Sequence, residues 1–417
     1  ETPAGGLLLT NLRTREQQNI SPQPRGANGR PASDWKYRFG WDAPLVRSPF
    51  GRKTLYFAAN VIFQSSDYGH TWENISSDLT TDDKSKQGPS GGPVFTDNST
   101  SEIYSTISAL AESPAKQGVL WAGTDDGNLQ YSGKGGGSWT MRKNFGGRIT
   151  HIEPDRKDPD TACVSVERHM LDDFKPYLFR TTDAGQTWTA ITAGIAPNAF
   201  VWTVHEDAHN PDTLYAGTEL GIYVSTNAGA SWSPFHLGTL PWAVAVRDIV
   251  QHPETGDLIV ATHGRGIWIL DNPERPALRF TMRATRSFYG DQTYTAPNPP
   301  YGALIPSQGP FQIKDAAGNV VRDLKQGPWD LRNNEGVQVL PGTYTIGDRK
   351  IEVALDPTLN VSLDDLKLKY ETEMKLKKLK NDPLFRLLDS TNAAPTPAIL
   401  KAVAALESDA APKDNAK

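Results

Sequence analysis

The chain has 417 residues, which is more than one ordinary domain, and its 43 Lys and Arg against 48 Asp and Glu give a formal charge of −5. This mild acidity excludes a global attraction to nucleic acid or anionic membranes, and the one cysteine, Cys163, excludes an internal disulfide and a cysteine-based zinc cluster. No apolar run approaches the ~20 residues of a membrane helix. The start at Glu1, with no initiator Met and no leader, favours a processed chain or part of a longer product.

Four related octapeptides mark a repeat in the first 270 residues. They are "SSDYGHTW" (65–72), "SGKGGGSW" (132–139), "TTDAGQTW" (181–188) and "STNAGASW" (225–232). Their tryptophans are 67, 49 and 44 residues apart, and the last two spacings match the period of propeller blades. An inserted loop at 78–100 explains the longer first spacing. A fifth β-rich run, "DLIVATHGRGIWILD", lacks the octapeptide and ends the array.

Each repeat predicts four antiparallel strands, a to d, with the octapeptide as the turn between c and d. Such a unit is one propeller blade. The N-terminal run 5–21 fits strands c and d of an earlier blade. We therefore expect an all-β, incomplete propeller over residues 1–272, with about four whole and two partial blades. Because proteins rarely leave sheet edges unpaired, a missing N-terminal part or another chain is expected to supply further blades.

The octapeptide is predicted to hold a turn together rather than to catalyse a reaction. Its Asp accepts backbone hydrogen bonds, its Gly supplies a positive φ, and its Trp is expected to pack between blades. The second and fourth copies replace Asp67 by Lys134 and Asn227, whereas a reaction centre would not be copied once per blade and then lost. The residues expected to have this structural role are Ser65, Asp67, Gly69, Trp72, Trp139, Asp183, Gly185, Trp188, Asn227, Gly229 and Trp232.

These octapeptides resemble the Asp-box, or BNR repeat, of sialidases and sortilin-type receptors. The blade sequences and the stretches "HGRGIWILD", "NPPYGA" and "PGTYT" extend this resemblance. Over about residues 5–355 the chain is similar to the C-terminal portion of bacterial sortilin-N/BNR-repeat proteins. The resemblance implies an exported propeller and says little about activity. Sialidases also carry an F/Y-R-I-P motif, and "YRFG" (37–40) is a poor match, which argues against sialidase activity.

The turns between strands b and c are expected on the face opposite the octapeptides, which is the usual ligand face of propellers. Paired carboxylates there could serve glycoside hydrolysis, the face could bind a cationic, polyhydroxylated or protein ligand, or the turns could simply be charged. We expect no metal and no cofactor, since the histidines lack ligand spacing. The candidate residues are Asp125, Asp126, Glu167, Arg168, His169, Asp172, Asp173, Glu219, His263 and Arg265. Loop 78–104 could dock a partner or cover the surface.

The C-terminal third changes pattern after "DNPERP". We expect a linker at 273–297 and a small β-sandwich of fibronectin or flagellar-hook-cap type at 298–358. A helical segment at 359–410 should begin at a capping box of Ser362 and Asp365 and include a second short helix from Thr396. The last residues, 411–417, are expected to form a mobile tail.

The leading functional hypothesis is a non-catalytic propeller that serves as a scaffold or as a protein- or glycan-binding module in a larger assembly. We expect it to be exported from a bacterium, as a periplasmic, cell-surface or secreted protein without a transmembrane segment. One alternative is a polysaccharide-acting glycoside hydrolase whose site is completed by the missing blades. A second alternative is a sortilin-like peptide- or protein-binding receptor domain. A nucleic-acid partner is not expected.

Overall fold

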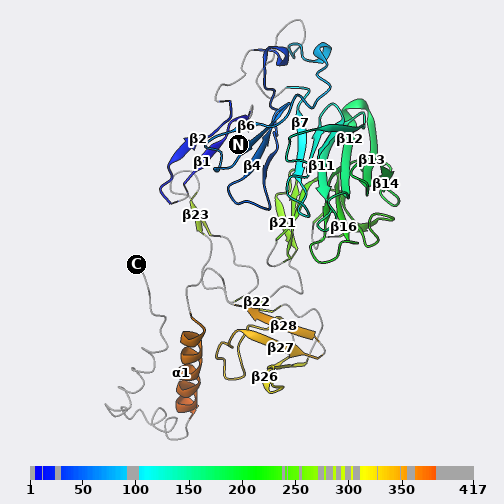
Figure 1. Ribbon diagram of the computed structural model, residues 1–417. Coiled ribbons are helices and arrows are strands. Elements are labelled where there is room, and N and C mark those ends of the chain that lie inside the picture. The colour runs from blue at the N-terminus through cyan, green and yellow to red at the C-terminus, as the bar shows by residue number, and fades with distance from the viewer. Residues whose placement is uncertain are drawn as a thin grey trace. The chain divides into compact units, whose positions relative to one another are not determined.

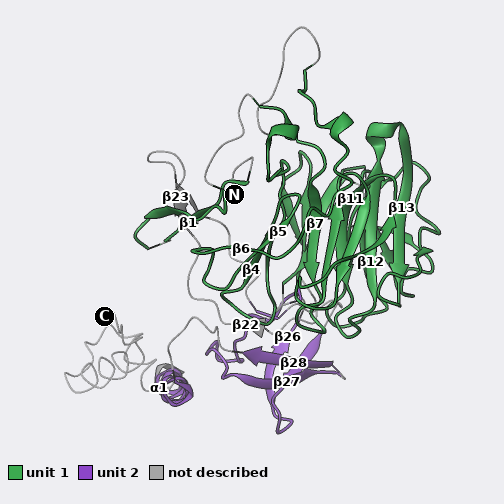
Figure 2. Ribbon diagram, turned by 45° about the horizontal axis from the view of Figure 1, so that its top comes forward, with its two compact units in different colours: residues 1–253, 257–270 green, residues 254–256, 271–417 purple. Residues whose placement is uncertain are grey.

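The chain folds into two compact units, formed by residues 1–253 with 257–270 and by residues 254–256 with 271–417 (Figure 2). The structure is a computed structural model. It describes residues 5–11, 13–23, 30–91, 103–236, 240–241, 243–252, 256–270, 277–278, 285–287, 293–295, 302–303, 310–325, 327–347, 349–354 and 362–381. The first unit contains the repeats, and the second contains a separate sheet and a helix.

Four sheets of four antiparallel strands make up most of the first unit, and in each the chain runs from one strand to its neighbour. Figure 1 shows these sheets following one another in chain order. This is the blade arrangement of a propeller, so the four whole blades are confirmed. They consist of β3–β6 (Leu45–Arg47, Leu55–Ala58, Ile62–Ser65, Glu73–Asn74), β7–β10 (Ile107–Glu112, Leu120–Thr124, Asn128–Ser132, Thr140–Asn144), β11–β14 (Arg148–Pro154, Ala162–Arg168, Asp173–Thr181, Thr189–Ala190) and β15–β18 (Val201–Glu206, Leu214–Thr218, Gly221–Ser225, Ser233–Phe235).

Two smaller sheets are the partial blades at the ends of the array. The last one has three strands, β19 (Val246–Gln251), β20 (Leu258–Thr262) and β21 (Ile267–Leu270). The first one is the pair β1 (Leu8–Thr10) and β2 (Gln17–Asn19). Among the described residues, no fourth strand pairs with β21. The prediction of two partial blades is therefore also confirmed.

Tryptophans of the octapeptides identify β1 and β2 as strands c and d of a preceding blade. Three indoles donate to the carbonyl of the isoleucine that follows strand d of the blade before: Trp72 to Ile20 at 2.6 Å, Trp139 to Ile75 at 3.2 Å and Trp232 to Ile191 at 2.6 Å. Ile20 follows β2 as Ile75 follows β6. Trp188 differs, because its indole donates to Gly185 of its own turn while its ring packs edge-on against Trp121 and Phe145.

The hydrophobic core lies between neighbouring blades rather than at one centre. Trp121 is fully buried in the cluster between the second and third blades, and Ile149 belongs to the same cluster. Strand b of a blade can lie this close to strand a of the next only where side chains are small. A Cβ on Gly123 would lie 2.4 Å from a methyl group of Ile149, and one on Gly217 would lie 2.8 Å from a methyl group of Val246 on β19. This packing explains why two b strands contain an Ala-Gly-Thr sequence.

The first half of loop 78–104 packs against the blades. Arg38 is 2% exposed, and its guanidinium lies 2.7 Å from Asp78 and 3.2 Å from Asp82. The buried Leu79 offers its carbonyl to the side chain of Gln130 at 2.9 Å. This half of the loop is therefore structural cover. Residues 92–102 lie outside the described residues, so a docking role for that half stays a prediction.

The second unit is built on a five-stranded sheet in the order β22 (Ala277–Leu278), β28 (Arg349–Ala354), β27 (Gly342–Ile346), β25 (Phe311–Lys314) and β26 (Val320–Leu324). Its core surrounds the fully buried Trp329. The only other sheet described after residue 271 is the two-stranded pair of β23 (Thr285–Ser287) and β24 (Thr293–Thr295). The predicted β-sandwich of 298–358 is therefore not confirmed by the described strands and stays a prediction.

The expected linker at 273–297 is wrong in part, because it contains β22, β23 and β24, and β22 pairs in parallel with β28. The prolines that suggested a linker lie just before β22, and proline is tolerated beside an edge strand. The expected helix is α1 (Leu363–Asn381), and Ser362 accepts a hydrogen bond from the backbone of Asp365 at 3.1 Å, as the capping box requires. The second short helix and the tail lie outside the described residues.

Candidate functional site

The octapeptide turn contains a repeated network of hydrogen bonds. In all four copies the hydroxyl of the first residue accepts a hydrogen bond from the backbone N–H of the glycine at the fifth position. The pairs are Ser65 with Gly69, Ser132 with Gly136, Thr181 with Gly185 and Ser225 with Gly229, at 2.8 to 3.0 Å. Each of these glycines has a positive φ, which glycine adopts without a steric penalty. The hydroxyl and the glycine are therefore the constant elements of the turn, and the acidic residue varies.

Asp67 is held as an ion by this network. Hydrogen bonds from the backbone and then the hydroxyl of Thr71, at 2.9 and 2.7 Å, and one from Ser65 lower the pKa of Asp67 to about 2. The pKa of Asp183 is likewise lowered to about 2, chiefly by the Thr187 hydroxyl. A carboxylate with all these donors is poorly suited to exchange protons near neutral pH. The geometry accordingly supports a structural role for this turn.

The predicted ligand-face residues all lie in or beside turns between strands b and c. These turns join β8 to β9, β12 to β13, β16 to β17 and β20 to β21. The central strands β7, β11, β15 and β19 begin on the same face and contact one another around the array. Each of the four has a β-bulge near its start, at Ser108, Thr150, Trp202 and Arg247 respectively. Bulges redirect side chains and are frequent beside functional sites.

The four bulge residues divide into two kinds. Ser108 donates to the carbonyl of Ile149 at 2.7 Å, and Thr150 donates to that of Val201 at 3.5 Å, so these small residues tie one blade to the next. Trp202 and Arg247 instead have large side chains. The Arg247 guanidinium lies 3.5 Å from the centre of the Trp202 ring, within the range of a cation–π contact.

An aromatic cluster surrounds Trp202. The imidazole of His169 stacks on Phe200 with ring centres 5.1 Å apart and meets Trp202 edge-on at 5.6 Å. The Trp202 indole donates to the carboxylate of Glu219 at 2.8 Å. Two predicted residues from different blades, His169 and Glu219, are thus brought together through aromatic residues that belong to the start of β15 and the loop before it.

The acids of the third blade are occupied by partners within the protein. Glu167 is 4% exposed, accepts from the backbone of His169 at 3.1 Å and bonds its imidazole. Asp173 accepts from the hydroxyl of Tyr177 at 2.6 Å and lies 3.7 Å from Arg168, which stacks on the Tyr177 ring. These contacts hold the long turn in place and leave few free acceptors for a substrate.

Asp125 is the most perturbed acid on this face. Burial raises its pKa to about 7, although Thr106 donates to it from both backbone and hydroxyl at 2.9 Å. Its neighbour Asp126 is engaged by the backbone and hydroxyl of Thr81 at 2.9 and 2.7 Å. The positive charge of Arg148 acts in the opposite direction and lowers the pKa of Asp125. The Arg148 guanidinium binds Asp42 at 2.6 and 2.7 Å.

Apolar side chains on this face are exposed to solvent. The turn between β12 and β13 contains the 3-10 helix η4 (His169–Leu171) and ends at Asp172 with a φ of 58°. In this turn Met170 is 84% exposed and Leu171 66%, and Phe174, on β13 directly after the turn, is 49% exposed. Trp41, next to the ion-paired Asp42, is 64% exposed. Large exposed apolar groups on a turn that internal hydrogen bonds hold in place are typical of interaction sites.

The last predicted pair stands apart from the cluster. His263 and Arg265 are exposed in the turn between β20 and β21, and Arg265 offers its carbonyl to the Trp268 indole at 2.9 Å. Among the described residues, no hydrogen bond, ion pair or ring contact joins either side chain to Trp202 or Glu219. In the part of the chain that the structure describes, no three His, Cys, Asp or Glu side chains form a metal-holding group.

The sequence did not predict five residues of this face that lie at or just before the start of a strand a. They are Asp42, Arg148, Phe200, Trp202 and Arg247. The repeat register gave a usable signal for three of them, since Arg148, Trp202 and Arg247 all occupy the first or second position of a predicted inner strand. The pairing of Asp42 with Arg148, 106 residues apart, had no signal in the sequence.

Comparisons with known proteins do not assign the chain to a family. No protein-family model matches the chain, and no curated protein does. A GH74 xyloglucanase structure from Xanthomonas campestris is 16% identical with a TM-score of 0.45, covering 65% of this chain and 41% of its own. PorZ of Porphyromonas gingivalis, a surface component of the type-IX secretion system, is 14% identical with a TM-score of 0.43, covering 84% of this chain and 56% of its own.

A third similar structure is YCF48 from Cyanidioschyzon merolae, 12% identical with a TM-score of 0.41, which covers 64% of this chain and 77% of its own. The chain spans less than half the length of each of the first two GH74 structures it matches. The blade topology itself, with four whole and two partial sheets, defines the chain as a β-propeller protein. No helix among the described residues has the length and apolar character needed to cross a membrane.

Proposed function

We propose that this chain is a non-catalytic, exported propeller module that binds a polypeptide partner through the face of the b–c turns. The observation that supports this most is the η4 turn, which presents Met170 and Leu171 to solvent next to the exposed Phe174 of β13. Exposing large apolar groups is unfavourable for an isolated protein, and the hydrogen bonds of Glu167 and Asp173 hold the turn in that conformation.

A small apolar pocket of about 200 Å³ adds to this face. It lies beside the b–c turn of the fourth blade and is lined by Leu220, Tyr223, Phe235, Leu240 and Pro241 among others. A pocket of this size accepts one apolar side chain of a partner. Together with η4, it favours a polypeptide with apolar side chains over a polysaccharide.

We further propose that additional blades complete the array at β1 and β21, from another part of a longer product or from a second protein. The support is the edge of β21, which has no partner strand among the described residues, and the exposure of Leu8 and Leu9 on β1, at 47% and 38%. Exposed apolar strand edges promote association unless they are covered.

The binding proposal can be tested by peptide display selected on the wild-type chain, followed by fluorescence anisotropy with the enriched peptides. We expect the M170S/L171S variant to bind them at least about 10-fold more weakly. The control is M141S, which changes a 54%-exposed methionine on β10. Equal binding by M170S/L171S and wild type, or the failure of any peptide to enrich, would contradict the proposal.

Glycoside hydrolysis is the second candidate, favoured by one observation. A carboxyl group with a pKa of about 7, such as Asp125, suits a general acid. A retaining or inverting mechanism also needs a second carboxylate about 5–10 Å away. Hydrolysis of any member of a polysaccharide panel that is lost in D125N, with the fold intact by circular dichroism, would favour this function over the binding module.

A further inference from the structure

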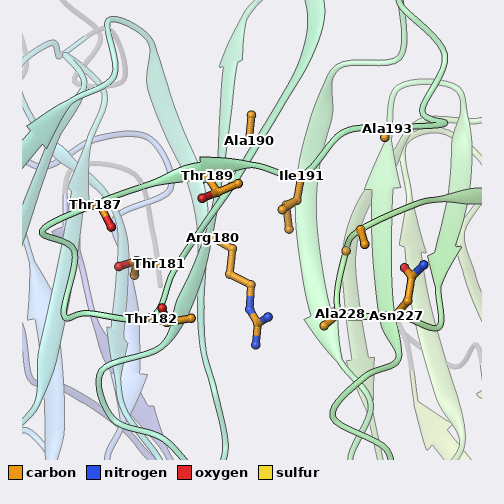
Figure 3. Close-up of a pocket in the computed structure, with 12 residues that line it drawn as sticks. Arg180, Thr181, Thr182, Thr187, Thr189, Ala190, Ile191, Ala193, Asn227 and Ala228 are labelled. Carbon is orange, nitrogen blue, oxygen red and sulfur yellow. The ribbon is translucent and has the colours of Figure 1, made fainter.

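A pocket of about 400 Å³ opens on the side of the propeller, between the third and fourth blades. One wall is formed by β13 and β14, and the other by the octapeptide turn of the fourth blade, residues 227–230. In Figure 3 the side chain of Arg180 extends into the space between these walls, with Asn227 and Ala228 opposite. This site is separate from the b–c turn face, because β13 and β14 border it near their octapeptide ends.

Arg180 has a charge that nothing in the described part of the chain neutralises. The residue is half-buried, and its guanidinium makes no ion pair and no hydrogen bond with any described residue. Other half-buried or buried arginines of this unit have partners. Arg38 binds Asp78 and Asp82, Arg148 binds Asp42, and Arg142 lies 4.7 Å from the centre of the Tyr131 ring. A partly buried cation without a counter-charge can gain a charge-assisted hydrogen bond from an anion, so Arg180 is expected to attract one.

The facing turn is the one octapeptide whose third position is neutral. The corresponding residues in the other copies are Asp67, Lys134 and Asp183. Asn227 keeps the turn intact by accepting from the backbone of Ser231 and donating to its hydroxyl, both at 2.9 Å. It therefore performs the structural task of the aspartate without placing a negative charge opposite Arg180.

Small side chains leave the groove open. The positions held by Tyr68 and His70 in the first copy are Ala228 and Ala230 in the fourth. The exposed residues Thr182 and Thr189 also line the pocket, and neither hydroxyl forms a hydrogen bond with a described residue. The groove thus offers one guanidinium and two free hydroxyl donors around a cavity, which is the donor set for an oxyanion.

We infer that this groove binds a carboxylate side chain of an extended acidic polypeptide segment. The carboxylate would receive hydrogen bonds from the Arg180 guanidinium and the threonine hydroxyls. A sugar acid is less suited, because none of the lining residues is aromatic, and sugar rings bind by stacking on such groups. β14 is the outermost strand of its sheet in the described residues, so a peptide strand can add to its free edge and fix the direction of the segment.

The test uses a capped pentapeptide of alternating valine and glutamate, titrated by microscale thermophoresis. We expect measurable binding that weakens with added salt. The same peptide with glutamine in place of glutamate should bind at least about 10-fold more weakly, and R180Q should lose a similar factor. The matched control is R142Q, which removes the half-buried arginine of the neighbouring groove and should leave binding unchanged.

N227D provides a second test that does not depend on removing a residue. Aspartate is native at the same position of two other copies, so this variant should fold normally and keep the turn. Its negative charge should occupy Arg180 and weaken the peptide by about 10-fold. Unchanged binding by both R180Q and N227D would overturn the inference, as would equal binding of the glutamine peptide.

Two further titrations identify the source of the anion. Glucuronate and inorganic phosphate are each titrated against the wild type and R180Q. Binding of either one that depends on Arg180, without binding of the acidic peptide, would overturn the assignment to a polypeptide. The M170S/L171S variant should keep the acidic-peptide binding, so failure of the face proposal and failure of this inference are distinguishable.

Discussion

Strands β17 and β21 have the same position in two successive blades, 45 residues apart, and differ sharply in burial. Ile222 of β17 is 4% exposed, whereas Ile267 of β21 is 73% exposed. β17 pairs with β18 at its outer edge, while β21 has no such neighbour in the described residues. The repeat therefore specifies an apolar residue at this position, and only the surrounding blade decides whether it contributes to stability.

The largest expected effect is a difference in the free energy of unfolding between alanine variants at these two positions. Ile222→Ala should lower the free energy of unfolding by about 3 kcal/mol, since it removes a buried side chain and leaves a cavity. Ile267→Ala should change it by less than about 0.5 kcal/mol. Urea unfolding followed by tryptophan fluorescence measures both. A cost for Ile267→Ala close to that for Ile222→Ala would mean that β21 is covered in solution.

The second prediction extends the comparison to enclosed carboxyl groups. Burial raises the pKa of Asp125 to about 7, and burial together with Asp155 raises that of Glu206 to about 7. A raised pKa means that the folded state binds the proton more tightly than the unfolded state does. The resulting stabilisation of the folded state is complete below about pH 4 and is lost as pH rises through 7. Thermal unfolding should therefore be easier at pH 8 than at pH 5, by on the order of 2 kcal/mol.

The isosteric variant D125N/E206Q is the control for this pH dependence. It keeps the shape of both side chains and removes their titration. Its melting temperature should vary less between pH 5 and pH 8 than that of the wild type. A variant that varies as much as the wild type would show that other groups cause the loss.

The third prediction concerns the free edge itself. Ile267→Lys and Ile269→Lys together place charges on an exposed strand edge, where Ile269 is 63% exposed. Because charged edges resist strand-to-strand association, the double variant should remain monodisperse at concentrations where the wild type self-associates. Dynamic light scattering measures this, and a wild type that never associates would remove the basis for an uncovered edge.

The smallest expected effect compares two copies of the turn. Lys134→Asp gives the second copy an acid at the position of Asp67, which accepts hydrogen bonds from Thr71 in the first copy. This variant should raise the melting temperature slightly. Asp67→Ala should lower it by less than Ile222→Ala does. The stabilisation from Asp67 should be present above about pH 4 and fall as pH approaches 2, because hydrogen bonds lower its pKa to about 2.

Prediction succeeded where information was local and repeated. The octapeptide spacing located strands c and d of each blade, and the capping box located the start of α1. It succeeded less well in the C-terminal third, where proline-rich sequence suggested a linker and β22 joins the sheet through parallel pairing with β28, about 75 residues away. Such pairing is favoured by the final packing rather than by the sequence near Ala277.

By itself, the sequence determined the blade register, the structural turn and the number of whole and partial blades, because each depends on contacts within about 50 residues. The tertiary structure decided which side chains meet at the ends of the strands. The cluster of His169, Trp202, Glu219 and Arg247 comes from three blades. Likewise, only the tertiary structure places Asn227 opposite Arg180 and leaves this arginine without a counter-charge among the described residues. Such contacts arise when successive blades stack, a step that depends on long-range geometry and not on local pattern.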